Sequence, residues 1–116
     1  MNNRKTGAYY EALTEKYIAG RGFEILERNF RCRLGEIDLI AKDGDYLVFI
    51  EVKYRGSYLK GHPEEAVTAS KQKTIYKTAQ VYMIKNGYGE QIKARFDVAA
   101  VYPDETVKYY KNAFGG

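Results

Sequence analysis

The chain has a single cysteine, a single histidine and no tryptophan among its 116 residues. One cysteine excludes an internal disulfide, and one cysteine with one histidine excludes a zinc cluster of the Cys/His type. Long apolar runs are also absent, and the first residues are polar and basic, so we expect neither a signal peptide nor a membrane-spanning segment. These absences favour a cytoplasmic protein that has no membrane partner.

The composition is that of a folded, mildly basic protein. Hydrophobic residues make up 45% of the chain, enough for one core, and the length fits a single domain over residues 1–116. Lysine and arginine number 19 against 15 acidic residues, a net charge of +4. This excess favours an anionic partner, and nucleic acid is the commonest large one, although an ordinary basic protein explains the charge about as well.

Hydrophobic periodicity and turn signals predict an α/β fold in the order helix, three strands, helix, and one or two strands. The expected helices cover residues 7–21 and 68–86; the expected strands cover residues 23–33, 36–42, 47–54 and 95–102, with 106–111 as a candidate edge strand. Residues 56–63 are expected to form a loop. Because the long helix separates the third and fourth strands, it allows a parallel crossover and hence a mixed β-sheet flanked by helices.

Three charged residues form the clearest candidate for a chemical site. Glu51 and Lys53 share one face of their strand, because side chains two apart on a strand point the same way. Asp43-Gly44 predicts a hairpin to the strand that carries Asp38. A two-residue loop would set Asp38 diagonal to Glu51 and a four-residue loop directly opposite, both on one face, whereas a three-residue loop would separate them.

Two carboxylates on one sheet face repel each other unless a positive charge lies between them. Mg²⁺ or Mn²⁺ fits, because such a cation accepts one or two carboxylates and fills its other positions with water and substrate phosphates. Asp38 and Glu51 are therefore the predicted metal ligands, and Lys53 would activate water or stabilise charge on a phosphate. The alternative is a salt-bridge ladder on a solvated face, but the apolar third strand reads as central in the sheet.

An acidic residue followed by Glu-x-Lys at the end of an apolar strand resembles the PD-(D/E)XK nuclease superfamily. More narrowly, the sequence resembles the bacterial YraN-like family of uncharacterised, restriction-endonuclease-like proteins, and its layout is similar to archaeal Holliday-junction resolvases. The matching stretches cover most of the chain in order: residues 6–8 with Glu11, 28–31, 35–40, 49–55, 66–68 with Lys71, and 95–98. Ile37 stands where the superfamily has proline, which is not a ligand.

The resemblance implies a restriction-endonuclease-like fold and a metal-dependent site. It adds Glu11 to the candidate catalytic set of Asp38, Glu51 and Lys53; a solvated helix glutamate is the alternative for Glu11. It also implies a two-fold homodimer, because junction-resolving enzymes place two symmetric cuts.

Basic and polar residues near this face are the predicted nucleic-acid contacts, namely Arg55, Lys71, Gln72 and Arg31. The expected function is a metal-dependent endonuclease that binds DNA, branched DNA included, and hydrolyses phosphodiester bonds. The alternative is a non-catalytic nucleic-acid-binding or complex-forming module that keeps the nuclease fold.

Overall fold

The computed structural model describes residues 3–55 and 67–115, with side chains from Gly7 onward. Helix α1 (Asn3–Gly20) is followed by strands β1 (Glu24–Cys32), β2 (Gly35–Asp43) and β3 (Tyr46–Tyr54), then helix α2 (Ala69–Lys85) and strands β4 (Lys93–Val101) and β5 (Val107–Phe114). The predicted α/β class and order of elements are confirmed. The predicted loop at residues 56–63 lies outside the described residues.

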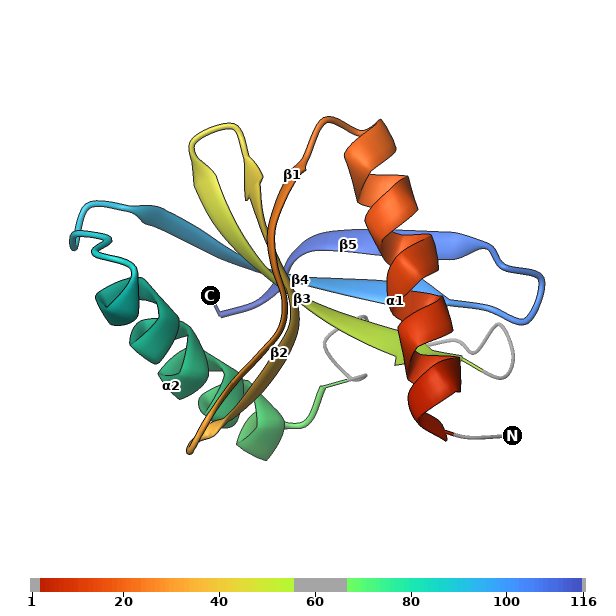
Figure 1. Cartoon of the computed structure of the whole chain (residues 1–116), viewed down its shortest axis with the longest axis horizontal. Helices are drawn as coiled ribbons and strands as arrows, with labels where there is room; N and C mark the ends of the chain where they lie inside the picture. Colours follow the sequence, from red (N-terminus) through yellow and green to blue (C-terminus); the bar gives the residue numbers. More distant parts are fainter. Residues whose placement is uncertain (1–2, 56–66, 116) are drawn as a thin grey trace.

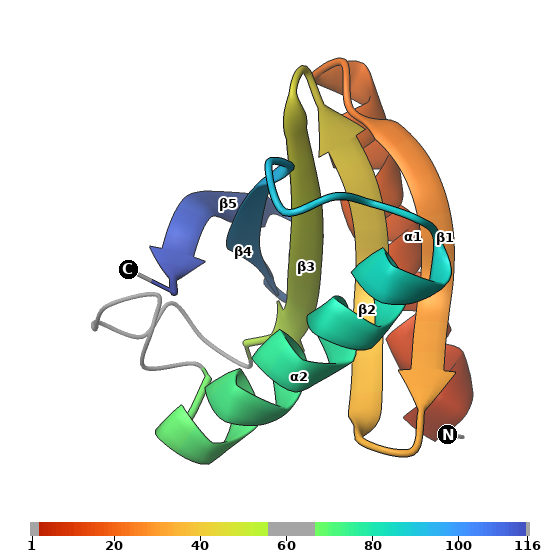
Figure 2. The same ribbon diagram turned by 90° about the vertical axis from the view of Figure 1, so that its left-hand side faces the viewer.

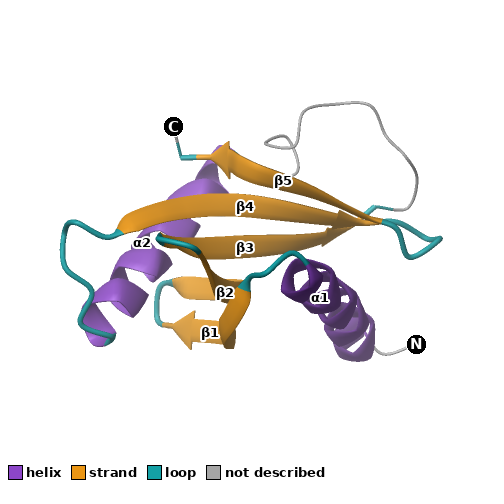
Figure 3. Cartoon of the chain, turned by 90° about the horizontal axis from the view of Figure 1, so that it is seen from above, coloured by secondary structure: helices purple, strands orange, loops and turns teal. Residues whose placement is uncertain are grey.

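The five strands form one mixed sheet in the order β1-β2-β3-β4-β5. Every neighbouring pair is antiparallel except β3 and β4, which run parallel. Helix α2 lies between β3 and β4 in the chain and covers one face of the sheet, while α1 lies on the other face (Figures 1 and 2). The parallel crossover expected from the long helix is therefore present. Figure 3 shows the sheet from above, with the two helices on opposite sides of it.

Each face of the sheet has its own hydrophobic core. On the α2 side, Phe49 of β3 packs with Ile75 and Tyr82 of α2. On the α1 side, Ile18 packs with Leu39 of β2 and with Val48 and Ile50 of β3. Residues 47–50 are all fully buried, as expected of a central strand covered on both faces. Strand β3 thus ends in charged residues directly after a segment buried between two layers.

The buried side of α1 is not the one that its aromatic and leucine residues mark. Tyr10, Leu13 and Tyr17 recur at helical spacing but are only half-buried, whereas Thr14 and Ile18 are fully buried. Thr14 can be buried because its hydroxyl donates to the carbonyl of Tyr10 at 3.0 Å, which satisfies its polar group within the helix. The line that faces the sheet therefore runs through Thr14 and Ile18.

Local signals fix the position of α2 over the sheet. Thr68 caps the helix by accepting a hydrogen bond from the backbone N–H of Lys71, and Asn86 follows its last residue. The helix approaches β2 closely at Gly35, where an added Cβ would lie 2.5 Å from Cγ2 of Thr74. Glycine is required there by packing.

In residues 3–55 and 67–115, no helix is long and apolar enough to cross a membrane.

Candidate active site

The β2–β3 hairpin brings Asp38 and Glu51 together. Leu39 pairs with Ile50, and the ladder continues to Asp43 and Tyr46, which leaves Gly44 and Asp45 as the turn. The pairing of residues 39–43 with 46–50 is the one expected from the four-residue loop, although the turn is tighter because Asp43 and Tyr46 also pair. The next position on each strand carries Asp38 and Glu51, so this register brings the two acids next to each other where the ladder ends.

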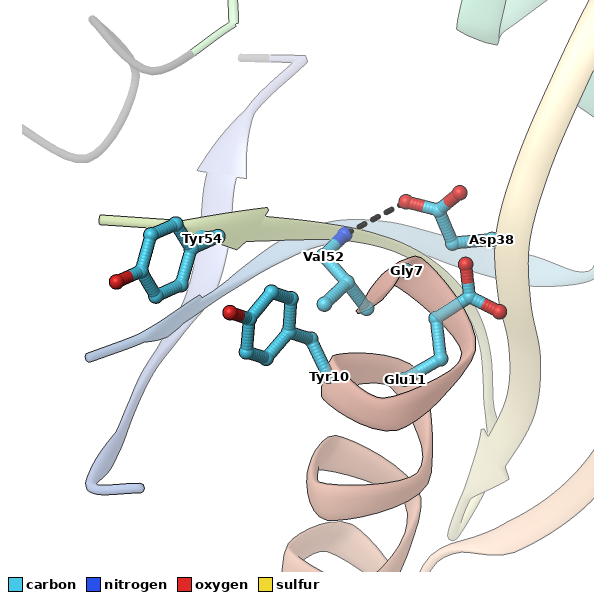
Figure 4. A pocket seen from close by; sticks show the side chains of 6 residues that line it. All are labelled: Gly7, Tyr10, Glu11, Asp38, Val52 and Tyr54. Carbon is cyan, nitrogen blue, oxygen red and sulfur yellow. Dashed lines mark hydrogen bonds between the residues drawn. The ribbon is translucent and has the colours of Figure 1, made fainter. Parts of the chain in front are cut away.

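Asp38 occupies the point where β2 and β3 separate. The ladder between the two strands ends at Leu39 and Ile50, and beyond it the Asp38 carboxylate accepts a hydrogen bond from the backbone N–H of Val52 at 2.8 Å (Figure 4). The side chain thus replaces a backbone acceptor that the diverging strand no longer supplies. This bond holds one carboxylate oxygen in place between the strands.

Glu51 is a buried acid next to Asp38. Only 6% of the residue is exposed, and one of its carboxylate oxygens, Oε2, is buried without a hydrogen-bond partner. Burial first, and then the hydrogen bond and negative charge of the neighbouring Asp38, together raise the pKa of Glu51 to about 9. Glu51 therefore keeps its proton at neutral pH and donates it in a hydrogen bond to Asp38.

Two lysines act on Glu51 in the opposite direction. The positive charges of Lys71 and Lys53 lower the pKa of Glu51, Lys71 more strongly than Lys53. Lys71 comes from the first turn of α2, and Lys53 follows Glu51 by two residues on β3. Lys71, predicted as a nucleic-acid contact, therefore also belongs to the electrostatic surroundings of the carboxylates. Cations from two elements therefore act on the charge of Glu51.

Glu11 of α1 approaches the same carboxylates from the helix. Burial raises the pKa of Glu11 most, and the negative charge of Asp38 also raises it, while a hydrogen bond with Asn29 lowers it. Glu11 is three residues before Thr14 and seven before Ile18, so it lies on the buried line of the helix. Glu11 thus faces Asp38, as Figure 4 shows. The structure favours this position over a solvated outer face.

A cavity of about 280 Å³ opens beside Asp38 and Glu11. It is lined by Gly7, Tyr10, Glu11, Asp38, Val52 and Tyr54 (Figure 4). The rings of Tyr10 and Tyr54 stack with their centroids 4.5 Å apart, which builds an aromatic wall next to the carboxylates. Sequence reasoning missed both tyrosines. The only signal was position, because each directly adjoins a candidate site residue.

Two of the other predicted nucleic-acid contacts have side-chain partners within the protein. Arg31 forms an ion pair with Glu36 at 3.2 Å, and the Gln72 amide donates to the carbonyl of Val67 at 2.9 Å. The backbone N–H of Arg55 donates to Val101, which brings the end of β3 beside the end of β4. None of these contacts tests nucleic-acid binding, which stays a prediction for all four residues.

The predicted metal ligands form a pair. In the described part of the chain, no three His, Cys, Asp or Glu side chains come close enough together to form a metal-binding group. Two carboxylates suffice for Mg²⁺, which commonly takes one or two from the protein and completes its shell with water and phosphate oxygens. The unpartnered Oε2 of Glu51 is the kind of donor atom that such a cation would occupy.

A second polar cluster ties β4 to β5 away from these acids. Asp97 is fully buried and accepts hydrogen bonds from the guanidinium of Arg95, the hydroxyl of Tyr109 and the backbone N–H of Asn112. Arg95 also pairs with Asp43 at 2.9 Å, beside the hairpin turn. Sequence reasoning gave no role to Asp97. Its contacts indicate that it stabilises the edge of the sheet.

Comparison with known proteins identifies the family of the chain. Residues 10–101 match the profile of the uncharacterised protein family UPF0102, which covers most of the sequence. The chain belongs to this family. It is 50% identical over 117 residues to a UPF0102 protein of Clostridium botulinum strain Hall, with 97% of this chain and 95% of the relative covered. A UPF0102 protein of Lachnoclostridium phytofermentans is 46% identical over 114 residues, covering 98% of this chain and 96% of the relative.

Membership in this UPF0102 family agrees with the YraN-like resemblance in the sequence. The family is uncharacterised, so membership carries no activity. The function of the chain must therefore be argued from the site.

Proposed function

We propose that this UPF0102 protein is a metal-dependent nuclease that hydrolyses phosphodiester bonds in DNA, at a site built from Asp38, Glu51, Lys53 and Glu11. The observation that carries the proposal is the buried acid pair. Glu51 is almost completely buried with one oxygen unpartnered, and its neighbour is another acid. Such an arrangement destabilises a fold unless a ligand compensates it, and a divalent cation that displaced the Glu51 proton would compensate the charges of both carboxylates.

The residues present fit a hard divalent cation. Asp38 and Glu51 supply oxygen donors from neighbouring strands, and the surroundings contain no thiol or imidazole ligand in the described residues. This donor set suits Mg²⁺ or Mn²⁺ rather than zinc. A cation held by these two side chains would supply Lewis-acid chemistry, namely the polarisation of a phosphoryl oxygen.

The protein's own side chains would perform the remaining tasks. Glu51, once ionised, would orient the attacking water through its free oxygen, and Lys53 would stabilise the negative charge that develops on the phosphate. Lys71 would add a second positive charge from α2. Glu11 would hold water or an additional cation contact opposite Asp38.

The cavity beside the acids suits a nucleotide unit of the substrate. The cavity has a volume of about 280 Å³, and the stacked rings of Tyr10 and Tyr54 form part of its wall. Aromatic rings accept the flat faces of bases and sugars without regard to sequence. Substrate would therefore be positioned by shape and stacking next to the acid pair, and the net charge of +4 favours its approach.

A binding module without catalysis is the second candidate, and it keeps the same fold. Arg31 and Gln72 already have protein partners, but Lys71 remains beside the site and the cavity remains open. A module of this kind would bind nucleic acid through charge and stacking, and its acid pair would be a remnant of the nuclease layout. The two-fold dimer expected from the resemblance belongs to both candidates, and light scattering with and without DNA would test it.

A substrate panel separates the two candidates. Purified protein should be incubated with linear duplex, single-stranded and four-way-branched DNA in Mg²⁺ and in Mn²⁺, together with Asp38→Asn and Lys53→Ala. We expect metal-dependent cleavage of at least one substrate by the natural chain and no cleavage by either variant. Asp38→Asn keeps an oxygen that accepts from Val52, so folding should survive. Binding without cleavage of any substrate would favour the module, and cleavage that survives Asp38→Asn would place the activity elsewhere.

A further inference from the structure

A second cavity, of about 340 Å³, lies at the C-terminal end of α1 and takes no part in the proposed site. It is lined by Tyr17, Ile18, Arg21, Phe23, Tyr109 and Lys111. Ile18 and Phe23 are buried and form the apolar part, while Tyr17 and Tyr109 are half-buried. The rings of Tyr17 and Tyr109 lie 6.1 Å apart in a stacked arrangement, and the Phe23 ring meets Tyr109 edge-on at 5.7 Å. The cavity is therefore largely aromatic.

Two cations border the aromatic rings. The guanidinium of Arg21 lies 4.7 Å from the centre of the Tyr17 ring, and the ammonium of Lys111 lies 5.7 Å from the centre of the Phe23 ring. Arg21 is exposed and forms no ion pair with any carboxylate of residues 3–55 and 67–115. Lys111 is 60% exposed and approaches only Asp43, at 3.5 Å. Both head groups are therefore accessible to an anion from solvent.

The acids around this cavity are already paired with a cation of the protein. Asp97 and Asp43 are both bound by Arg95, at 2.9 Å in each case. The Tyr109 hydroxyl donates to Asp97 at 2.7 Å, so the ring is held in place from behind and presents its face rather than its hydroxyl. With Arg95, Arg21 and Lys111 set against two carboxylates, one positive charge remains at the rim.

We propose that this cavity binds one nucleotide unit, with the base against the rings of Tyr17, Phe23 and Tyr109 and the phosphate between Arg21 and Lys111. Rings alone would accept any apolar ligand, and the two cations alone would accept any anion. A cavity that has both selects a ligand in which a flat aromatic group is joined to an anion. Base–aromatic stacking tolerates every base, and arginine and lysine are the usual phosphate partners. The ligand class is thus a 5′-nucleotide, free or within a strand.

The position of the cavity favours a nucleotide within a strand, and this part of the inference rests on the proposed nuclease function. Glu11 and Ile18 lie on the same line of α1, about 10 Å apart along the helix axis. That distance corresponds to about three nucleotides at the stacked spacing of a nucleic-acid strand. A strand cut at the acid pair would therefore reach the second cavity with a short stretch of its own length. The cavity would hold the strand at a fixed distance from the site of cleavage.

Nuclear magnetic resonance titration of the isotope-labelled full chain tests the binding. Adenosine 5′-monophosphate should shift the amide signals of residues 17–23 and 109–111, and inorganic phosphate or adenosine should do so at least about tenfold more weakly, since a charge-assisted contact is worth about that factor. The double variant Arg21→Ala/Lys111→Ala should weaken nucleotide binding by about tenfold or more. The matched control Lys16→Ala/Lys77→Ala removes two exposed charges elsewhere and should leave binding unchanged.

The outcomes distinguish this cavity from the proposed active site. No shift at millimolar nucleotide, or equal affinity for inorganic phosphate, would overturn the nucleotide pocket. A single-stranded DNA oligonucleotide should bind the Arg21→Ala/Lys111→Ala variant more weakly and the Asp38→Asn variant as the natural chain does. If the double variant loses mononucleotide binding but binds the oligonucleotide as before, the proposal that the cavity holds a nucleotide within a strand is wrong. The cavity would then be a pocket for free nucleotides. Loss of cleavage in Asp38→Asn with intact nucleotide binding would support both sites separately.

Discussion

Replacing Glu51 with glutamine should make the metal-free protein more stable at neutral pH. Glutamine has the shape of the protonated acid, and its amide can donate to Asp38 as the acid proton does. The natural side chain is buried, and burial together with Asp38 raises its pKa from 4.5 to about 9. The folded protein therefore resists the ionisation that the unfolded chain undergoes freely. The variant removes this penalty.

The direction and the size of this change in stability follow from proton linkage. Below pH 4.5 Glu51 is protonated in both states and costs nothing; between 4.5 and about 9 the folded state holds a proton that the unfolded state releases. The free energy of unfolding of the natural chain therefore falls as pH rises through this window. At pH 7 the difference amounts to about 3 kcal/mol, from 1.36 kcal/mol per pKa unit.

Urea unfolding at pH 4.5 and at pH 7, in the presence of a chelator, measures this difference. The Glu51→Gln variant should match the natural chain at pH 4.5 and exceed it by about 3 kcal/mol at pH 7. Glu24→Gln, at an exposed glutamate of β1, is the matched control and should change stability by no more than about 0.5 kcal/mol at either pH. A Glu51→Gln protein that is no more stable at pH 7, or whose advantage is the same at both pH values, would refute the buried-acid reasoning.

Three further predictions concern packing, the second polar cluster and binding. Gly35→Ala places a Cβ 2.5 Å from Thr74 and should cost about 1–3 kcal/mol in the same urea assay, whereas unchanged stability would mean that α2 can move. Asp97→Asn breaks a fully buried ion pair and should cost about 3–5 kcal/mol without altering metal binding. DNA affinity should fall steeply with added salt because counterions are released, and Arg55→Ala with Lys71→Ala should flatten that dependence without unfolding the chain; salt-independent binding would contradict the charge argument.

The order of elements could be predicted from the sequence because each element carries its own local signal. Apolar runs marked β3 and β4, a turn signal marked the hairpin, and helical spacing with a following glycine marked α2. The closeness of Asp38 and Glu51 was predictable because both even loop lengths bring the two residues together. Only the boundaries differed; β5, for example, extends to Phe114 rather than to residue 111.

The remaining features depend on contacts between distant parts of the chain. The buried line of α1 does not follow from apolar spacing because Thr14 counts as polar, although a hydrogen bond within the helix allows its burial. The stack of Tyr10 on Tyr54 joins residues that nothing in the sequence links. The raised pKa of Glu51 likewise depends on burial within the folded protein and on the neighbouring Asp38, which no local pattern reveals.

Calorimetric titration of the protein with Mn²⁺ tests most directly the central claim that Asp38 and Glu51 together hold a divalent cation. Because Glu51 carries a proton at neutral pH, cation binding at pH 7 should release close to one proton, seen as a heat that depends on the ionisation enthalpy of the buffer. Asp38→Asn should weaken binding severely, and Glu51→Gln should weaken it and abolish the proton release. Mn²⁺ binding that is unchanged in both variants, or that releases no proton in the natural chain, would contradict the account.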